Sequence, residues 1–102
     1  MNRFGLSSED YALFENLLIQ PMKNKGYRIW VFGSRARGKH HKYSDIDVLY
    51  ESKFHSQDAR FIGDLEESLE NSNLPIKVDL VNVEDLATSY EQSVFVPRIE
   101  ID

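Results

Sequence analysis

The chain has 102 residues and a formal net charge of −5, from 12 basic and 17 acidic side chains. This acidic balance argues against direct binding of nucleic acid, because most of the surface would repel phosphates. Cysteine is absent, which excludes disulfides and thiolate zinc sites. No stretch approaches the roughly 20 apolar residues that span a bilayer, and the N-terminus lacks the apolar core of a signal peptide. We therefore expect a cytoplasmic protein without membrane contact, folded as one domain over residues 1–102.

The spacing of apolar residues predicts alternating helices and strands. The first helix is expected at residues 7–24, with Ser7 or Ser8 as its N-cap and Pro21 at the point where it kinks or ends. The other predicted elements are strands at 27–32 and 46–50, a helix at 56–71, a strand at 76–83, a short helix at 84–93, and an edge strand or extended arm at 94–102. The pattern favours an α+β domain, an α/β two-layer arrangement with helices packed on a mixed sheet of three or more strands.

The connection between the first two strands contains the residues with the clearest chemistry. Gly33 and Ser34 follow the first strand, where backbone N–H groups and a hydroxyl can approach a phosphate closely. Asp45 and Asp47 open the second strand, about 6.6 Å apart on one face, where they can share Mg²⁺. If both pairs serve one ligand, the two strands are expected to be antiparallel neighbours or nearly so. The alternatives are a helix-capping Ser34 and two solvated aspartates.

A second motif overlaps the glycine turn. Residues 33–40 nearly match the P-loop pattern Gly-x-x-x-x-Gly-Lys-[Ser/Thr], but His40 cannot supply the hydroxyl that binds Mg²⁺. A chain of this length also leaves little room for the parallel sheet that carries a P-loop. Four basic residues follow the turn within eight positions and are either a solvated loop or a counter-charge for a triphosphate: Arg35, Arg37, Lys39 and Lys42.

The combined pattern, Gly33-Ser34 followed across ten residues by Asp45-Ile46-Asp47, resembles the signature of the polymerase-beta-like nucleotidyltransferase superfamily. The short chain is similar to the stand-alone minimal nucleotidyltransferases (MNT), the antitoxin type encoded beside HEPN-domain proteins. This resemblance implies a third carboxylate on a later strand, for which Asp79 is the candidate. From the residues alone, a carboxylate within an apolar strand needs a partner, which is either a metal or a basic side chain.

The resemblance also implies the roles of the site residues. Asp45, Asp47 and Asp79 are expected to be catalytic and to bind two Mg²⁺ ions. The residues expected to bind the nucleotide are Gly33, Ser34, Arg35, Arg37 and Ser44.

The reaction implied is Mg²⁺-dependent transfer of AMP from ATP to a hydroxyl, expected to be that of a tyrosine on a HEPN-domain partner toxin. The resemblance thus implies that this chain is the antitoxin of a toxin-antitoxin pair. Two alternatives remain. One is a non-catalytic antitoxin that neutralises its partner by contact. The other is nucleotidyl transfer to an antibiotic or sugar, which the chain favours less because it lacks a separate acceptor domain.

Overall fold

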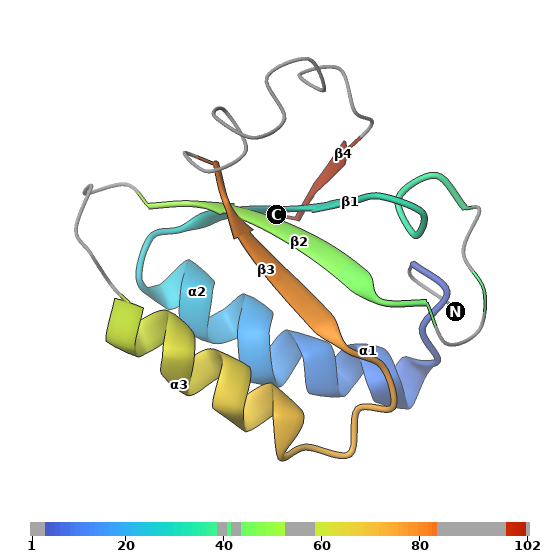
Figure 1. Ribbon diagram of the computed structural model, residues 1–102, viewed down its shortest axis with the longest axis horizontal. Helices are drawn as coiled ribbons and strands as arrows, with labels where there is room; N and C mark the ends of the chain where they lie inside the picture. The colour runs from blue at the N-terminus through green and yellow to red at the C-terminus, as the bar shows by residue number, and fades with distance from the viewer. Residues whose placement is uncertain (1–3, 39–40, 42–43, 53–58, 84–97, 102) are drawn as a thin grey trace.

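The computed structural model describes residues 4–38, 41, 44–52, 59–83 and 98–101. Helices pack on one face of a four-stranded mixed sheet with the order β3-β2-β1-β4 (Figure 1). This α+β architecture is the predicted one. In the described ranges no helix has the length and apolar character needed to cross a membrane. The elements in chain order are α1 (Ser8–Phe14), η1 (Glu15–Ile19), α2 (Gln20–Asn24), β1 (Arg28–Phe32), β2 (Ile46–Glu51), α3 (Ala59–Glu70), β3 (Val78–Asn82) and β4 (Arg98–Ile101).

The first three elements form one continuous helix (Figure 1). Ser7 is its N-cap, because the Ser7 hydroxyl accepts a hydrogen bond of 3.1 Å from the Asp10 N–H. Pro21 does not end the helix, which continues as α2. Directly before the proline the helix makes a π turn, in which the Gln20 N–H donates to the Glu15 carbonyl five residues back. This change of hydrogen-bond spacing falls where the proline has no N–H to donate.

The register of the sheet confirms that the two motif-bearing strands are antiparallel, with Phe32 of β1 opposite Asp47 of β2. On its other side β2 pairs in parallel with β3, and Asp47 lies opposite Asp79. β4 is an edge strand antiparallel to β1, as the C-terminal pattern predicts. The helix predicted at 84–93 lies outside the described residues, as does Ser56, the expected start of the helix observed as α3.

The strand residues that are buried against the helices show which of their neighbours project from the opposite face of the sheet. Ile29, Val31, Ile46 and Val48 are fully buried in the core that the helices cover. Each such side chain contributes roughly 1.5–3 kcal/mol by leaving water. Successive strand side chains point to opposite faces, so Asp47 is directed away from the helices.

The connection after β1 forms turns over residues 33–38. Arg35 lies in these turns and is only 3% exposed. Its Nε and Nη2 donate to the Ser44 carbonyl at 3.0 and 2.9 Å, and its Nη1 donates to the Phe4 carbonyl at 2.7 Å. One guanidinium therefore joins the N-terminal segment to the residue that precedes Asp45.

Replacing this guanidinium should destabilise the fold. We expect Arg35→Met to lower the free energy of unfolding by about 2–4 kcal/mol, because part-buried carbonyls lose charge-assisted hydrogen bonds. Urea denaturation measures the change.

Arg37→Met is the matched control, since Arg37 is an exposed arginine of the same loop. Its effect should stay within about 0.5 kcal/mol. Equal losses in both variants would show that the hydrogen bonds of Arg35 do not hold the loop.

Candidate active site

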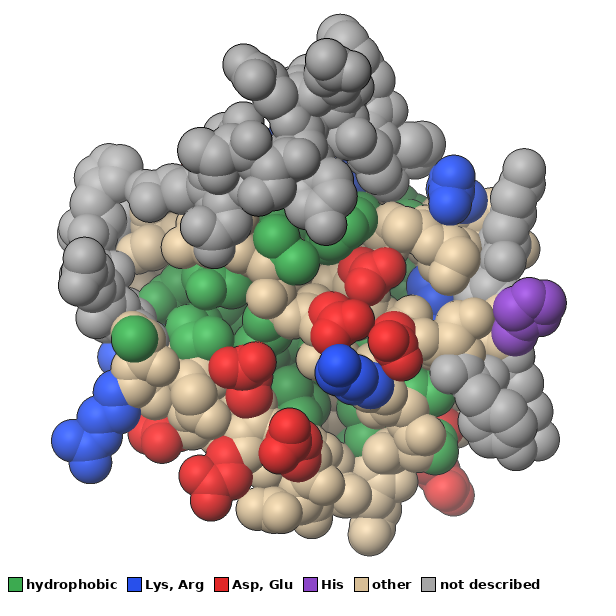
Figure 2. Space-filling model, in the orientation of Figure 1, with side chains coloured by type: hydrophobic (Ala, Val, Ile, Leu, Met, Phe, Trp, Pro, Cys, Tyr) green, Lys and Arg blue, Asp and Glu red, His purple; other side chains and the backbone are tan. Residues whose placement is uncertain are grey.

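The structure brings Asp47 and Asp79 to neighbouring positions on the sheet face opposite the helices. They are register partners on the parallel strands β2 and β3, so their side chains project from the same face. Asp45 is exposed and precedes β2, two residues before Asp47. Figure 2 shows acidic side chains gathered where β2 and β3 begin.

Gly33 places the turn after β1 directly against this group. Its φ is +75°, a conformation that side chains with a Cβ rarely adopt. A Cβ added at Gly33 would collide with Oδ2 of Asp47. The backbone of the turn therefore approaches the Asp47 carboxylate as closely as only a glycine allows.

The electrostatics of Asp47 reflect this crowding. Burial raises the pKa of the Asp47 carboxyl, and the nearby carboxylates of Asp79 and Asp45 raise it further. The charged form of Asp47 is thus disfavoured by both its neighbours and its surroundings. A cation bound between these groups would remove the penalty.

Asp79 has a basic neighbour. Lys77 Nζ lies 3.4 Å from Asp79 Oδ1, and their side chains are 72% and 38% exposed. Such an exposed ion pair contributes little to stability, so it leaves the carboxylate available to a stronger cation. A basic side chain was one of the two partners expected for Asp79, and Lys77, two residues before it, is such a partner.

The donor set suits a hard cation. Mg²⁺ prefers oxygen ligands and is usually held by one or two carboxylates together with substrate phosphates. In the part of the chain that the structure describes, no three ligating side chains form a ready-made metal cage. The register-paired Asp47 and Asp79 nevertheless fit an ion whose remaining ligands come from water and substrate.

Four of the residues expected to bind the nucleotide lie in the turn after β1 or at the end of the loop that follows it. Gly33 adjoins Asp47, Ser34 is partly exposed beside it, and Arg37 is exposed. Ser44 closes the end of the loop, where its hydroxyl accepts a hydrogen bond of 2.8 Å from the N–H of His41.

Arg35 differs from the expectation of direct phosphate contact. The hydrogen bonds described above direct its guanidinium to backbone carbonyls. Burial lowers the pKa of Arg35, and the charge of Asp45 opposes that effect.

The contact between Gly33 and Asp47 predicts a stability difference between two glycines. Gly38 also has a positive φ of +70°, but nothing lies within 4 Å of the position where its Cβ would stand. Both Gly→Ala changes pay the cost of a left-handed conformation. Gly33→Ala should lower the free energy of unfolding by about 1–3 kcal/mol more than Gly38→Ala, because its methyl group would overpack against Asp47. Urea denaturation measures both changes. Equal losses would contradict the close approach.

The raised pKa of Asp47 predicts a pH-dependent stability. Between the ordinary pKa of an aspartate and the raised pKa, the folded chain holds a proton that the unfolded chain has released. The stability of the unmodified protein therefore falls as the pH rises through this window. Asp47→Asn removes this dependence. Without divalent cations, and at a pH above the raised pKa of Asp47, the Tm of the variant should therefore exceed that of the unmodified protein by a few degrees.

Thermal unfolding in EDTA from about pH 4 to 8 measures the difference. Added Mg²⁺ should reduce or reverse it. A lower Tm for the variant at pH 7 in EDTA would show that the carboxylates do not repel one another as inferred.

Comparisons with known proteins agree with this geometry. The family model of the nucleotidyltransferase domain matches residues 17–101. A relative from Haemophilus influenzae, the probable protein adenylyltransferase MntA, is 37% identical over 93 residues, which cover 87% of this chain and 73% of the relative. A solved structure, the crystal structure of a toxin-antitoxin with AMP-PNP, matches with a TM-score of 0.60 and 29% identity over 84% of this chain and 70% of that chain.

The matched range contains the glycine turn and all three aspartates. The fold, the Gly-Ser turn against the carboxylates and the sequence matches point to the same kind of protein. The chain therefore belongs to the nucleotidyltransferase domain family and is a minimal nucleotidyltransferase.

Proposed function

We propose that this chain transfers AMP from ATP to a hydroxyl in a Mg²⁺-dependent reaction, and that the acceptor is a tyrosine of a HEPN-domain partner toxin. The observation that carries the proposal is the pairing of Asp47 with Asp79 across β2 and β3, beside the turn at Gly33. The similarity to a protein adenylyltransferase supports a protein as acceptor. The similarity to a toxin-antitoxin structure with an ATP analogue supports ATP and a partner protein.

Asp45, Asp47 and Asp79 are the residues that would hold two Mg²⁺ ions. When bound, the ions would neutralise charge on the phosphates and lower the pKa of the acceptor hydroxyl. Binding would also relieve the repulsion that raises the pKa of Asp47.

The other residues would position the triphosphate. Backbone N–H groups at Gly33 and the Ser34 hydroxyl would hold the β and γ phosphates, with Arg37 adding positive charge and Ser44 closing the loop. Arg35 would act indirectly, by tying this loop to the N-terminal segment.

In the transfer step the acceptor oxygen forms a bond to the α-phosphorus. The bond between that phosphorus and the bridging oxygen of the β-phosphate breaks, and pyrophosphate leaves with the electron pair. Asp79 would accept the proton of the acceptor hydroxyl.

The alternative is an antitoxin that neutralises its partner by contact without catalysis. The toxin-antitoxin similarity supports a partner in either case. The two possibilities differ in whether neutralisation requires Asp47.

Labelled ATP tests the proposal. We expect that the chain, incubated with Mg²⁺ and the product of the neighbouring gene, transfers label from α-³²P-ATP but not from γ-³²P-ATP. Asp47→Asn should reduce this transfer by more than about 100-fold. This is a larger loss than is usual when a residue that only orients a metal ligand is replaced. EDTA should abolish it.

Asp64→Asn is the matched control, because Asp64 is an exposed aspartate on α3. It should transfer label at the rate of the unmodified chain. Neutralisation of the partner that survives Asp47→Asn, with no label transferred by the unmodified chain, would favour the non-catalytic alternative.

A further inference from the structure

A cleft of about 570 Å³ lies between α3 and the strand that carries Asp79. Leu69, Leu74 and Ile76 give it an aliphatic lining, and Asp79 lines it together with its ion-pair partner Lys77. The volume is within the range of sites that bind small ligands. β3 is an edge strand of the sheet, so the cleft on its α3 side extends to Asp79 at this edge, although the Asp79 carboxylate projects from the face opposite the helices.

The sheet order separates this cleft from the turn at Gly33. Gly33 follows β1 on one side of β2, and Asp79 lies on β3 on the other side, so Asp47 stands between them. A triphosphate held at the turn would reach Asp47 from the β1 side. In an in-line displacement the attacking and leaving oxygens are on opposite sides of the phosphorus. The β3 side is therefore left for the acceptor.

The charge of the cleft also favours the acceptor over the triphosphate. Glu66 and Glu70, one helical turn apart on α3, are exposed and line the cleft. Figure 2 shows acidic side chains over α3 in addition to those where β2 and β3 begin. This acidic rim repels phosphates and attracts basic groups.

We infer that this cleft binds the acceptor, as an extended peptide segment of the protein that receives AMP. The segment would place an apolar side chain against Leu74 and Ile76, a lysine or arginine beside Glu70, and the acceptor hydroxyl toward Asp79. The inference rests on the proposed function, and it adds the site and the chemistry by which the acceptor is recognised.

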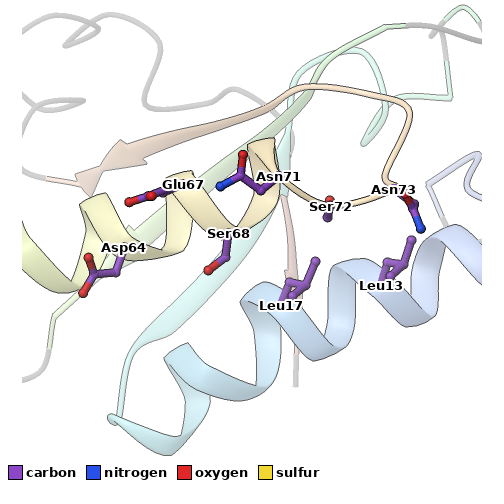
Figure 3. A pocket seen from close by; sticks show the side chains of 8 residues that line it. All are labelled: Leu13, Leu17, Asp64, Glu67, Ser68, Asn71, Ser72 and Asn73. Atoms are coloured by element: carbon purple, nitrogen blue, oxygen red, sulfur yellow. The ribbon is translucent and has the colours of Figure 1, made fainter.

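A second groove provides the matched comparison. It measures about 620 Å³ and lies between α3 and the first helix, with Leu13 and Leu17 in its lining. Figure 3 shows Glu67 on α3 among the residues of this groove. Glu67 is exposed and adjacent to Glu66 in sequence, but it does not line the cleft at Asp79. Glu67→Lys therefore changes the charge of the same helix outside the inferred site.

Peptide titration followed by NMR tests the site directly. A blocked pentapeptide of sequence KLYLK should shift the backbone amide signals of Glu70, Leu74 and Ile76 in the full chain. The peptide ELYLE should bind about threefold to tenfold more weakly, the effect expected of two exposed charges. Shifts of these signals by adenosine, and not by KLYLK, would assign the cleft to the nucleobase and overturn the inference.

The charge variants give a second measurement. Glu70→Lys should weaken KLYLK binding about threefold to tenfold and leave the affinity for Mg²⁺-ATP unchanged. Glu67→Lys should leave both affinities unchanged. Equal weakening by both variants would overturn the inference, because it would show a long-range effect of net charge.

These outcomes separate the inference from the proposed function. Binding of KLYLK at the cleft, without AMP transfer to any acceptor, would remove the proposed reaction and leave the peptide site. AMP transfer to a partner at the same rate in Glu70→Lys as in the unmodified chain, with no KLYLK shifts at the cleft, would remove the peptide site and leave the reaction.

Discussion

The packing of β2 on the helices is the constraint on which the site depends, because it places the carboxylates of Asp47 on β2 and Asp79 on β3 side by side on the opposite face of the sheet. Ile46 and Val48 are buried under the helices, so the residue between them must face outward. The parallel register then sets Asp79 beside it. A shift of the register by one residue would exchange the two faces, which the apolar core does not permit.

The groups around this pair have different tasks. Gly33 brings backbone close to one carboxylate, and Arg35 holds the loop that leads to Asp45. Lys77 offsets part of the charge of Asp79 without enclosing it. The proposed reaction uses this asymmetry, because the side of the turn suits phosphates and the side of the aliphatic cleft suits a peptide.

Much of the arrangement could be predicted from local pattern. The antiparallel pairing of β1 and β2 followed from the requirement that a glycine turn and two aspartates reach one ligand. The need of Asp79 for a partner followed from the cost of a carboxylate in an apolar strand. Its register with Asp47 did not follow, because parallel pairing depends on contacts between distant segments.

The basic loop shows where local pattern fails. Arg35 and Arg37 are alike in the sequence, yet one is buried and the other exposed. Arg35 donates to the carbonyls of Ser44 and Phe4, and the Phe4 carbonyl, 31 residues away, is a partner that no spacing rule identifies. The π turn before Pro21 is a similar case, since a proline normally predicts the end of a helix. Helix packing against the sheet outweighs that preference here.

The bond from Arg35 to Phe4 gives the beginning of the chain an influence on chemistry that lies far from it in sequence. Trimming through Phe4, or fusing a bulky tag immediately before it, would disturb an acceptor of the buried guanidinium. The loop leading to Asp45 would then lose one of its anchors although every motif residue remained intact. A tag on a recombinant version of this protein is thus best placed away from Phe4.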